Sequence, residues 1–147
     1  MYALNFDTIM CMNTIFEKII NKEVPASIIY EDDLVVSFLD INPNNKGQAL
    51  VVPKKKFVNI FDADEKTLEH MIVIAKKIAS ALVGSVDATG VNLVMNNGED
   101  ANQDIFHLHL HVIPRYKNDG VYKKSKHTSY EEGEADKLAI KIKKAIV

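Results

Sequence analysis

The chain has 147 residues and a mass of 16.5 kDa, and its composition of 47% hydrophobic and 26% charged residues is that of one folded domain rather than of a disordered chain. Its 18 basic and 20 acidic residues leave a net charge of -2, so charge gives no reason to expect binding to nucleic acid or to an anionic membrane surface, and no apolar run approaches the roughly 20 residues that span a bilayer. The single cysteine, Cys11, cannot form an internal disulfide or a cysteine-based zinc site alone, which favours a reducing, cytoplasmic location.

The first structured element is predicted after a short N-terminal appendage. Residues 1–12 lack Lys and Arg, so the positive region of a secretory signal is missing. We therefore expect an appendage over residues 1–12 and a single domain with a C-terminal helix over residues 13–147. Thr14, followed three residues later by Glu17, forms a capping-box pattern that predicts a short helix over residues 15–21.

Three short strands are predicted next. Residues 28–31 and 34–39 are rich in β-branched and aromatic side chains, and the acidic pair between them is a turn signal, so they predict a hairpin. Residues 42–47 form a loop by composition, and residues 49–52 predict a third strand that ends at Pro53.

The clearest helix is predicted over residues 62–83. Asp62 can cap it, with Glu65 three residues later. Apolar residues recur at three- and four-residue spacing, namely Leu68, Met71, Ile72, Ala75, Ala79 and Leu82. The helix is long for so small a domain, so a second chain could share its apolar face, and His70 is expected on its surface.

The last part of the chain is predicted to contain two strands and a helix. The strands are expected at residues 91–95 and 106–113, separated by a polar loop, and Pro114 is expected to end the second. Residues 134–146 predict an amphipathic terminal helix. Because several strands are joined by connections too short for a parallel crossover, we expect an α+β fold with a five-stranded, mainly antiparallel sheet and two or three helices.

Three of the five histidines fall within a span of only five residues, and this span lies in the last predicted strand. Because successive strand side chains point to opposite faces, His107, His109 and His111 are predicted to share one face, while the leucines and the valine between them face a core. Neighbouring histidines would lie about 6.6 Å apart at Cα, so one small charged ligand could meet all three.

This histidine pattern admits three interpretations. The rings could be structural, as satisfied imidazoles on a sheet face. They could bind a metal, since neutral imidazole is a good ligand for zinc, copper or iron. They could carry out nucleophilic or acid–base chemistry at a phosphate, because imidazole, with an ordinary pKa of about 6.5, needs no activating base near neutral pH. Spacing alone does not decide between the metal site and the phosphate chemistry.

The surroundings of the histidines help to choose between these interpretations. The loop of residues 96–104 is rich in small and amide side chains, and such loops can offer N–H groups to an anion. Asp40 ends a predicted strand, where its carboxylate could accept both hydroxyls of a ribose. A set of apolar residues could line a flat pocket for a base or could simply be core. This set is Ile15, Phe16, Ile19, Val24, Phe38 and Leu50.

The histidine segment resembles the signature of the histidine triad (HIT) superfamily of nucleotide hydrolases and transferases, His-φ-His-φ-His-φ-φ, which here reads HLHLHVI. The resemblance spans roughly residues 13–120 and includes, in the family's order, IFEKIINKEVPASIIYEDD, FLDINP, GQALVVPKK, NNGEDANQ and PRYKNDG. The Pro-Arg pair after the triad is more similar to the bacterial and Fhit-like branches than to the Hint branch.

The resemblance implies a HIT-like fold, usually paired into a homodimer with a continuous ten-stranded sheet. It implies that His109 is the nucleophile, which attacks the α-phosphorus of a nucleotide and forms a nucleotidyl-histidine that water then hydrolyses. His107 would orient His109 and its tautomer, and His111 would bind the phosphate or the atom that bridges to the leaving group. The family needs no metal in its active site, so no cofactor is expected.

The resemblance also implies a substrate site. Asp40, beside Ile41, would hold the ribose hydroxyls, Asn96 and Gln103 match positions on the phosphate side, and the apolar set matches the base pocket. The expected substrate is a purine nucleoside phosphoramidate or a related nucleotidyl compound, with a product such as AMP. A dinucleoside polyphosphate hydrolase, or a nucleotide-binding regulatory module with little turnover, is the alternative.

The chain departs from the family pattern at several positions. Many members have a histidine where this chain has Gln48, which can hydrogen-bond but cannot shuttle a proton near neutral pH. Some bacterial members hold zinc through positions that match Thr14, Glu17 and Lys56 here, so structural zinc is not expected. Asp104 stands where Ser or Thr is common. Its charge would repel a phosphate, so we expect it to turn away or to face the leaving group.

Overall fold

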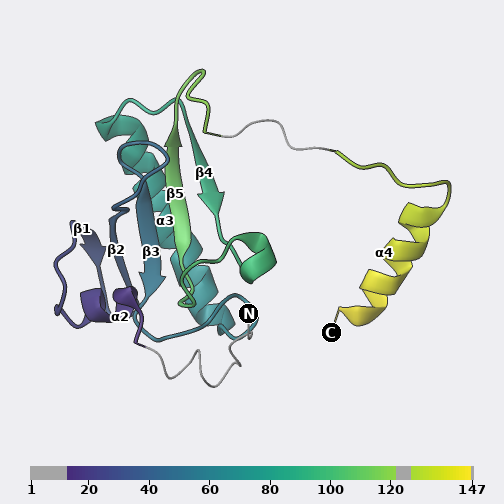
Figure 1. The fold of residues 1–147 in the computed structure, drawn as a ribbon, viewed down its shortest axis with the longest axis horizontal. Coiled ribbons are helices and arrows are strands. Elements are labelled where there is room, and N and C mark those ends of the chain that lie inside the picture. The colour runs from purple at the N-terminus through teal and green to yellow at the C-terminus, as the bar shows by residue number, and fades with distance from the viewer. Residues whose placement is uncertain (1–12, 122–126, 147) are drawn as a thin grey trace.

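The computed structural model describes residues 13–121 and 127–146, which form one sheet, the helices that cover it and a separate C-terminal helix (Figure 1). The predicted appendage, residues 1–12, lies outside the described residues. The elements follow in the order α2 (Ile15–Ile20), β1 (Ile28–Glu31), β2 (Val35–Leu39), β3 (Ala49–Pro53), α3 (Glu65–Ser85), β4 (Gly90–Val94), the 3-10 turn η1 (Glu99–Ala101), β5 (Leu110–Arg115) and α4 (Glu134–Ala145).

The sheet has five strands in the order β1-β2-β3-β5-β4, and every neighbouring pair is antiparallel. This confirms the predicted α+β fold. α3 lies across one face of the sheet, as Figure 1 shows, and packs on alternate residues of its strands. The buried core on this face consists of Val35, Ala49, Val51, Phe57, Met71, Ile74, Ala75, Ile78, Leu82, Leu108, Leu110 and Val112.

The opposite face of the sheet is covered in part by the short helix α2. At its start the Thr14 side chain accepts from the N–H of Glu17, and the Glu17 carboxylate accepts from the N–H of Thr14, so the predicted capping box is confirmed. A second buried cluster joins α2 to the sheet and contains Phe16, Val36, Phe38, Leu50 and Val52. Because α2 has only six residues, it leaves part of this face uncovered.

The N-cap of helix α3 lies two residues later than predicted. This residue is Asp64, whose side chain accepts a hydrogen bond from the N–H of Thr67 at 2.8 Å. The Asp62 carboxylate instead accepts from the N–H groups of Val58 and Asn59, both at 2.8 Å. Both aspartates cap a turn, and which of the two turns continues as a helix depends on tertiary packing.

The last strand is shorter at its start than the histidine pattern predicts. β5 begins at Leu110 rather than at residue 106, and it continues past Pro114 instead of ending there. Before β5, the N–H of Leu108 donates to the carbonyl of Phe57 at 2.7 Å, so a loop rather than a strand ladder holds this segment. Pro114 is tolerated because β3 pairs only with the first half of β5, which leaves β4 as the one strand beside the proline.

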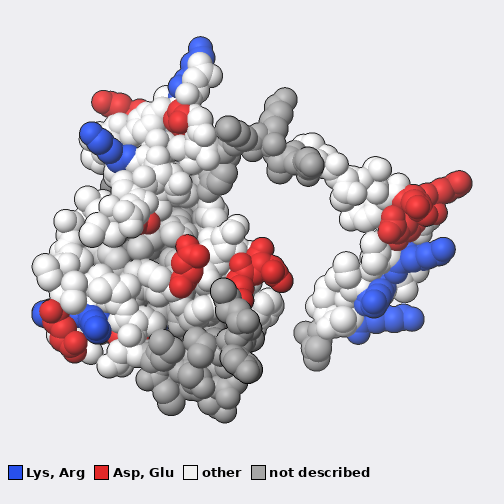
Figure 2. Space-filling view, in the orientation of Figure 1, with Lys and Arg blue, Asp and Glu red and all other residues white. Residues whose placement is uncertain are grey.

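Helix α4 stands apart from the rest of the described chain (Figure 1), and all of its residues are exposed. Acidic residues lie in its first turn and lysines in its last turn, as Figure 2 shows, and this arrangement complements the helix dipole. Within residues 13–121 and 127–146, no helix combines the length and the hydropathy needed to cross a membrane.

Candidate active site

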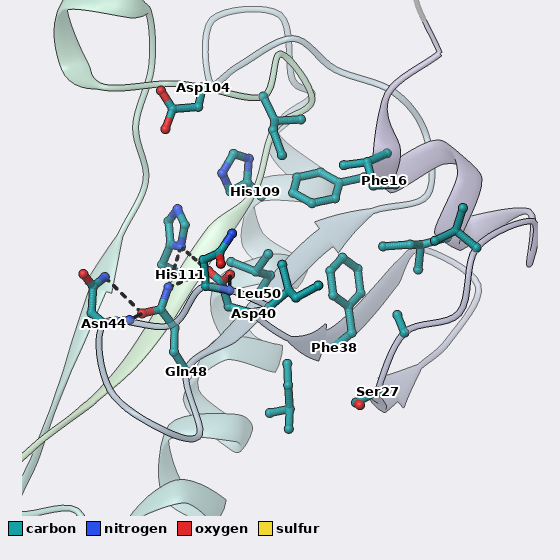
Figure 3. A pocket seen from close by; sticks show the side chains of 18 of the residues that line it. Phe16, Ser27, Phe38, Asp40, Asn44, Gln48, Leu50, Asp104, His109 and His111 are labelled. Atoms are coloured by element: carbon teal, nitrogen blue, oxygen red, sulfur yellow. Dashed lines mark hydrogen bonds and ion pairs between the residues drawn. The ribbon is translucent and has the colours of Figure 1, made fainter.

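A pocket of about 800 Å³ opens beside α2 on the face of the sheet opposite α3. Part of its wall is apolar, and part is made of histidine, carboxylate and amide side chains (Figure 3). Its volume is in the range that holds small-molecule ligands. The predicted site residues that line it are Ile15, Phe16, Ile19, Val24, Phe38, Asp40, Ile41, Gln48, Leu50, Asn96, Asp104, His109 and His111.

The pocket also contains residues that the sequence alone does not single out. They are Pro25, Ala26, Ser27, Leu39, Asn42, Asn44, Asn102 and Ile105. Most are close neighbours of predicted residues along the chain, and Asn102 lies in the amide-rich loop of residues 96–104. Asn44 differs because it binds a predicted residue, Gln48, through two hydrogen bonds.

His107 lies on the same side as the other two histidines, since its ring and that of His109 both pack against Phe16, but unlike them it does not line the pocket. The residue is 0% exposed, its Nε2–H donates to the carbonyl of Pro53 at 2.8 Å, and its Nδ1 accepts from the Thr14 hydroxyl at 3.3 Å. Burial lowers the pKa of His107, so the ring is neutral near pH 7. This side chain therefore anchors the segment before β5 rather than meeting a ligand.

His109 lies in the pocket wall, with its ring edge-on to Phe16 at 5.0 Å between ring centres. Its Nδ1–H donates to the backbone carbonyl of His107 at 2.7 Å, which places the proton on Nδ1 and leaves a lone pair on Nε2. Burial lowers the pKa of His109, and this hydrogen bond only partly opposes the effect, so the neutral ring dominates near pH 7. A neutral ring with a free lone pair is the form that a nucleophile or a metal ligand requires.

His111 is the second histidine of the pocket, and its ring centre lies 4.8 Å from that of His109. Its Nδ1 accepts a hydrogen bond from Nε2 of Gln48 at 3.1 Å and lies 3.8 Å from Oδ2 of Asp40. Burial, reinforced by the neighbouring His109, lowers the pKa of His111 to about 4, and the Asp40 carboxylate opposes this only in part. His111 is therefore neutral near pH 7.

Asp40 and Gln48 form a hydrogen-bonded unit beside His111 (Figure 3). Asp40 follows β2, and its two oxygens accept from the N–H of Asn42 at 2.9 Å and from Nε2 of Gln48 at 2.7 Å. Gln48 is 1% exposed, and its Oε1 accepts from the backbone and side-chain N–H groups of Asn44 at 2.8 and 3.0 Å. All four hydrogen-bonding positions of this amide are thus engaged within the protein, so Gln48 orients its neighbours rather than presenting a free group to a substrate.

Gln103, which is predicted on the phosphate side, lies beneath the loop and not in the pocket wall. Its amide oxygen accepts from the N–H of Gly98 at 2.8 Å, and its amide nitrogen donates to the carbonyls of Val58 and Ile105 at 2.6 and 3.2 Å. Gln103 therefore fixes the shape of the loop that carries two of the predicted pocket residues.

The positions that the resemblance links to zinc hold a different set of groups here. The Lys56 ammonium lies 3.1 Å from a carboxylate oxygen of Glu17, and the Thr14 hydroxyl contacts His107. A cation in this set disfavours a metal ion. Among the residues that the structure describes, no three His, Cys, Asp or Glu side chains are grouped so that they could hold a metal.

Comparisons with known proteins relate most of this chain to one family. A family model described as HIT domain matches residues 21–118. An uncharacterized HIT-like protein of Borreliella burgdorferi is 48% identical over 108 residues, which cover 72% of this chain and 78% of that protein.

Solved structures share the fold as well as the sequence pattern. A HIT family protein from Bacillus anthracis has a TM-score of 0.85 at 36% identity, and the alignment covers 92% of this chain and 98% of that chain. A hypothetical histidine triad nucleotide-binding protein from Sulfolobus tokodaii has a TM-score of 0.70 at 37% identity, and the alignment covers 88% of each chain. The residues matched by the family model include both the sheet and the segment that carries the histidines.

Proposed function

The chain belongs to the HIT family, and from this we propose that it is a nucleotide hydrolase or nucleotidyl transferase that acts at the α-phosphate of purine nucleoside phosphoramidates or related nucleotidyl compounds. The observation that carries the proposal is the position of His109 in the pocket wall beside His111. The lone pair on Nε2 of neutral His109 suits attack on phosphorus. The family resemblance assigns the nucleophile to the same residue.

The composition of the pocket supports a nucleotide as the ligand. Phe16, Phe38 and Leu50 offer apolar surface to a purine base. The Asp40 carboxylate keeps lone pairs after its two hydrogen bonds within the protein, so it can still accept from ribose hydroxyls. With the base and the ribose held in this way, the α-phosphate would lie beside the two pocket histidines.

The reaction would proceed as two displacements at the α-phosphorus. In the first, Nε2 of His109 forms a bond to phosphorus while the bond to the leaving amine breaks, and the amine keeps the electron pair and takes a proton from solvent. In the second, water attacks the nucleotidyl-histidine, the bond to Nε2 breaks, and a nucleoside monophosphate is released with His109 restored. One water is consumed overall, and the covalent intermediate replaces one difficult step by two easier ones.

Asp104 favours phosphoramidates over dinucleoside polyphosphates as substrates. It lines the pocket on the side of His109 away from Asp40 (Figure 3). A carboxylate there would repel a polyphosphate leaving group and attract an amine that gains positive charge as it leaves. We therefore place the leaving amine next to Asp104.

The direct test is the release of AMP from adenosine phosphoramidate by the wild type and by His109→Ala. Loss of the nucleophile is expected to lower kcat by about 10,000-fold or more and to abolish an adenylyl-protein adduct trapped by a denaturing quench at alkaline pH, where the bond between histidine and phosphorus survives, and seen by intact-protein mass spectrometry. His70→Ala is the matched control because His70 lies on α3, where it binds Asp32 at 2.7 Å and is not part of the pocket wall.

Three outcomes would change the proposal. Equal turnover by the wild type and His109→Ala would overturn the assignment of the nucleophile. Faster turnover of dinucleoside polyphosphates than of phosphoramidates would overturn the role given to Asp104. Tight binding of AMP with no turnover of either class would replace the enzyme by a nucleotide-binding module.

We also propose that the protein is a homodimer. β4 is an edge strand of the five-stranded sheet, and Leu93 on β4 and Ile72 and Val83 on α3 are about half exposed. A second copy paired along β4 would satisfy the open strand edge and extend the sheet to ten strands. Sedimentation is expected to give twice the chain mass, and a mass near 16.5 kDa at micromolar concentration would contradict the dimer.

A further inference from the structure

The direction of every hydrogen bond made by Gln48 is determined by its neighbours. The backbone N–H of Asn44 can only donate, so the amide atom that it contacts at 2.8 Å must be the oxygen of Gln48. The amide nitrogen therefore points the other way, toward Oδ2 of Asp40 at 2.7 Å and Nδ1 of His111 at 3.1 Å. An ionised Asp40 can only accept, and this requires the same orientation independently.

This orientation decides which nitrogen of His111 carries the proton. Gln48 presents an N–H group to Nδ1, so Nδ1 must be the acceptor, and the proton of the neutral ring lies on Nε2. The sheet neighbours of His111 are Leu50 on β3 and Val94 on β4, which are uncharged and do not compete for the ring nitrogens.

We propose that Gln48 is a positioning residue for the reaction proposed above, on which this inference rests: it holds His111 as a neutral Nε2–H donor toward the bound phosphate and ties that donor to Asp40. A neutral imidazole can stabilise charge on a phosphoryl oxygen by hydrogen bonding, but it cannot also give up the Nε2 proton, because it would become an imidazolate. The leaving amine takes its proton from solvent instead.

The consequence is a pH profile without a basic limb from His111. The titratable groups that face His111 are Asp40, at 3.8 Å, and His109, at 4.8 Å between ring centres. Burial keeps the pKa of His111 low, at about 4, so the ring is neutral throughout the neutral and alkaline range. An imidazolium donor would lose its proton, and with it the rate, as the pH rises through its pKa, whereas a neutral Nε2–H donor retains its proton.

The test replaces the amide donor by an acceptor of the same shape. In Gln48→Glu an oxygen faces Nδ1 of His111 whether the new carboxyl is ionised or shares a proton with Asp40, so Nδ1 is expected to become protonated. Nitrogen-15 NMR of histidine-labelled, ligand-free protein at pH 7 shows directly which ring nitrogen of His111 carries the proton. In the wild type, His111 is expected to be protonated on Nε2 alone. The kcat/KM for adenosine phosphoramidate is expected to fall about tenfold to a hundredfold in the variant and to acquire a basic limb.

Two further variants make the result specific. Gln103→Glu is the matched control, because it makes the same change at a second buried glutamine whose amide contacts only backbone groups, and the His111 tautomer is expected to stay unchanged. Gln48→Met removes the donor without adding a charge. It is also expected to move the proton to Nδ1, toward Asp40, and it serves as the test variant if Gln48→Glu does not fold.

The outcomes separate this inference from the proposed function. Protonated Nδ1 of His111 in the wild type at pH 7, or an unchanged tautomer in the folded Gln48 variants, would overturn the role of Gln48. The expected tautomers in a protein that turns over no nucleotide would support the role of Gln48 in orienting His111 and would overturn the proposed function alone, because the NMR measurement needs no substrate.

Discussion

The two faces of the sheet are built from alternate residues of the same strands, yet they differ in what covers them. On one face the 21-residue helix α3 closes an apolar core, whereas on the other the six-residue helix α2 leaves room for the pocket. Leu50 and Val51 are neighbours in β3, but Leu50 lines the pocket and Val51 lies in the core beneath α3. A period of two residues thus separates the side chains that stabilise the fold from those that form the site.

The largest expected effect is that a substitution in the core beneath α3 lowers the free energy of unfolding but leaves kcat unchanged. Ile74 lies on the side of α3 that packs against the sheet, and it is only 1% exposed. Ile74→Ala is expected to lower the free energy of unfolding by about 2–5 kcal/mol, through lost burial and the cavity left behind. The kcat of the folded protein should remain close to that of the wild type. Urea denaturation measures the first quantity, and AMP release at a temperature where the variant stays folded measures the second. A large fall in kcat of fully folded Ile74→Ala would show that the two faces are coupled.

Acid is expected to destabilise the protein through the histidines on the pocket side. Burial lowers the pKa values of His107, His109 and His111, so below pH 6.5 the unfolded chain binds protons that the folded chain does not. The free energy of unfolding therefore falls as the pH falls. For His111, with its pKa of about 4, the loss between pH 7.5 and 5 amounts to about 2 kcal/mol.

The pH dependence of the free energy of unfolding distinguishes substitutions on the pocket side of the sheet from substitutions in the core beneath α3. Urea unfolding at pH 7.5 and pH 5 is expected to give a smaller difference for His111→Gln than for the wild type, because one proton-binding group is lost from the unfolded chain. Ile74→Ala should lower the free energy of unfolding equally at both pH values, since no titratable group is removed. Equal slopes for the wild type and His111→Gln would contradict the low pKa of His111 in the folded state.

The division between the two faces could be predicted from sequence because alternation is a local property. The HLHLHVI segment places apolar and polar side chains on opposite sides at any strand position, and Leu108, Leu110 and Val112 do lie in the core beneath α3. The capping box of Thr14 and Glu17 is predictable from sequence for the same reason, because both partners lie within the first turn of α2.

The rest depends on contacts between residues far apart in the chain. The segment before β5 leaves the ladder because Leu108 binds Phe57 and the His107 side chain binds Pro53, and no local pattern records either contact. The sequence predicts Gln48 as a site residue, but it does not predict the two hydrogen bonds that Asn44 donates to the Gln48 side chain. These bonds form only when the loop between the two residues has folded.

The smallest expected effect concerns a polar residue on the apolar side of the sheet. Ser37 pairs with Val51 and so faces α3; it is 0% exposed, and its hydroxyl has no hydrogen-bond partner among the described residues. Because a buried hydroxyl without a partner destabilises the fold, Ser37→Ala is expected to raise the free energy of unfolding by about 0.5–1 kcal/mol and to leave kcat unchanged. Ser85→Ala, which removes an exposed hydroxyl that donates to the carbonyl of Ala81 at 2.7 Å, is the control and should give no gain in urea denaturation. If Ser37→Ala were less stable than the wild type, the hydroxyl would have to be hydrogen-bonded in solution, and the core beneath α3 would depend on a polar contact as the pocket side does.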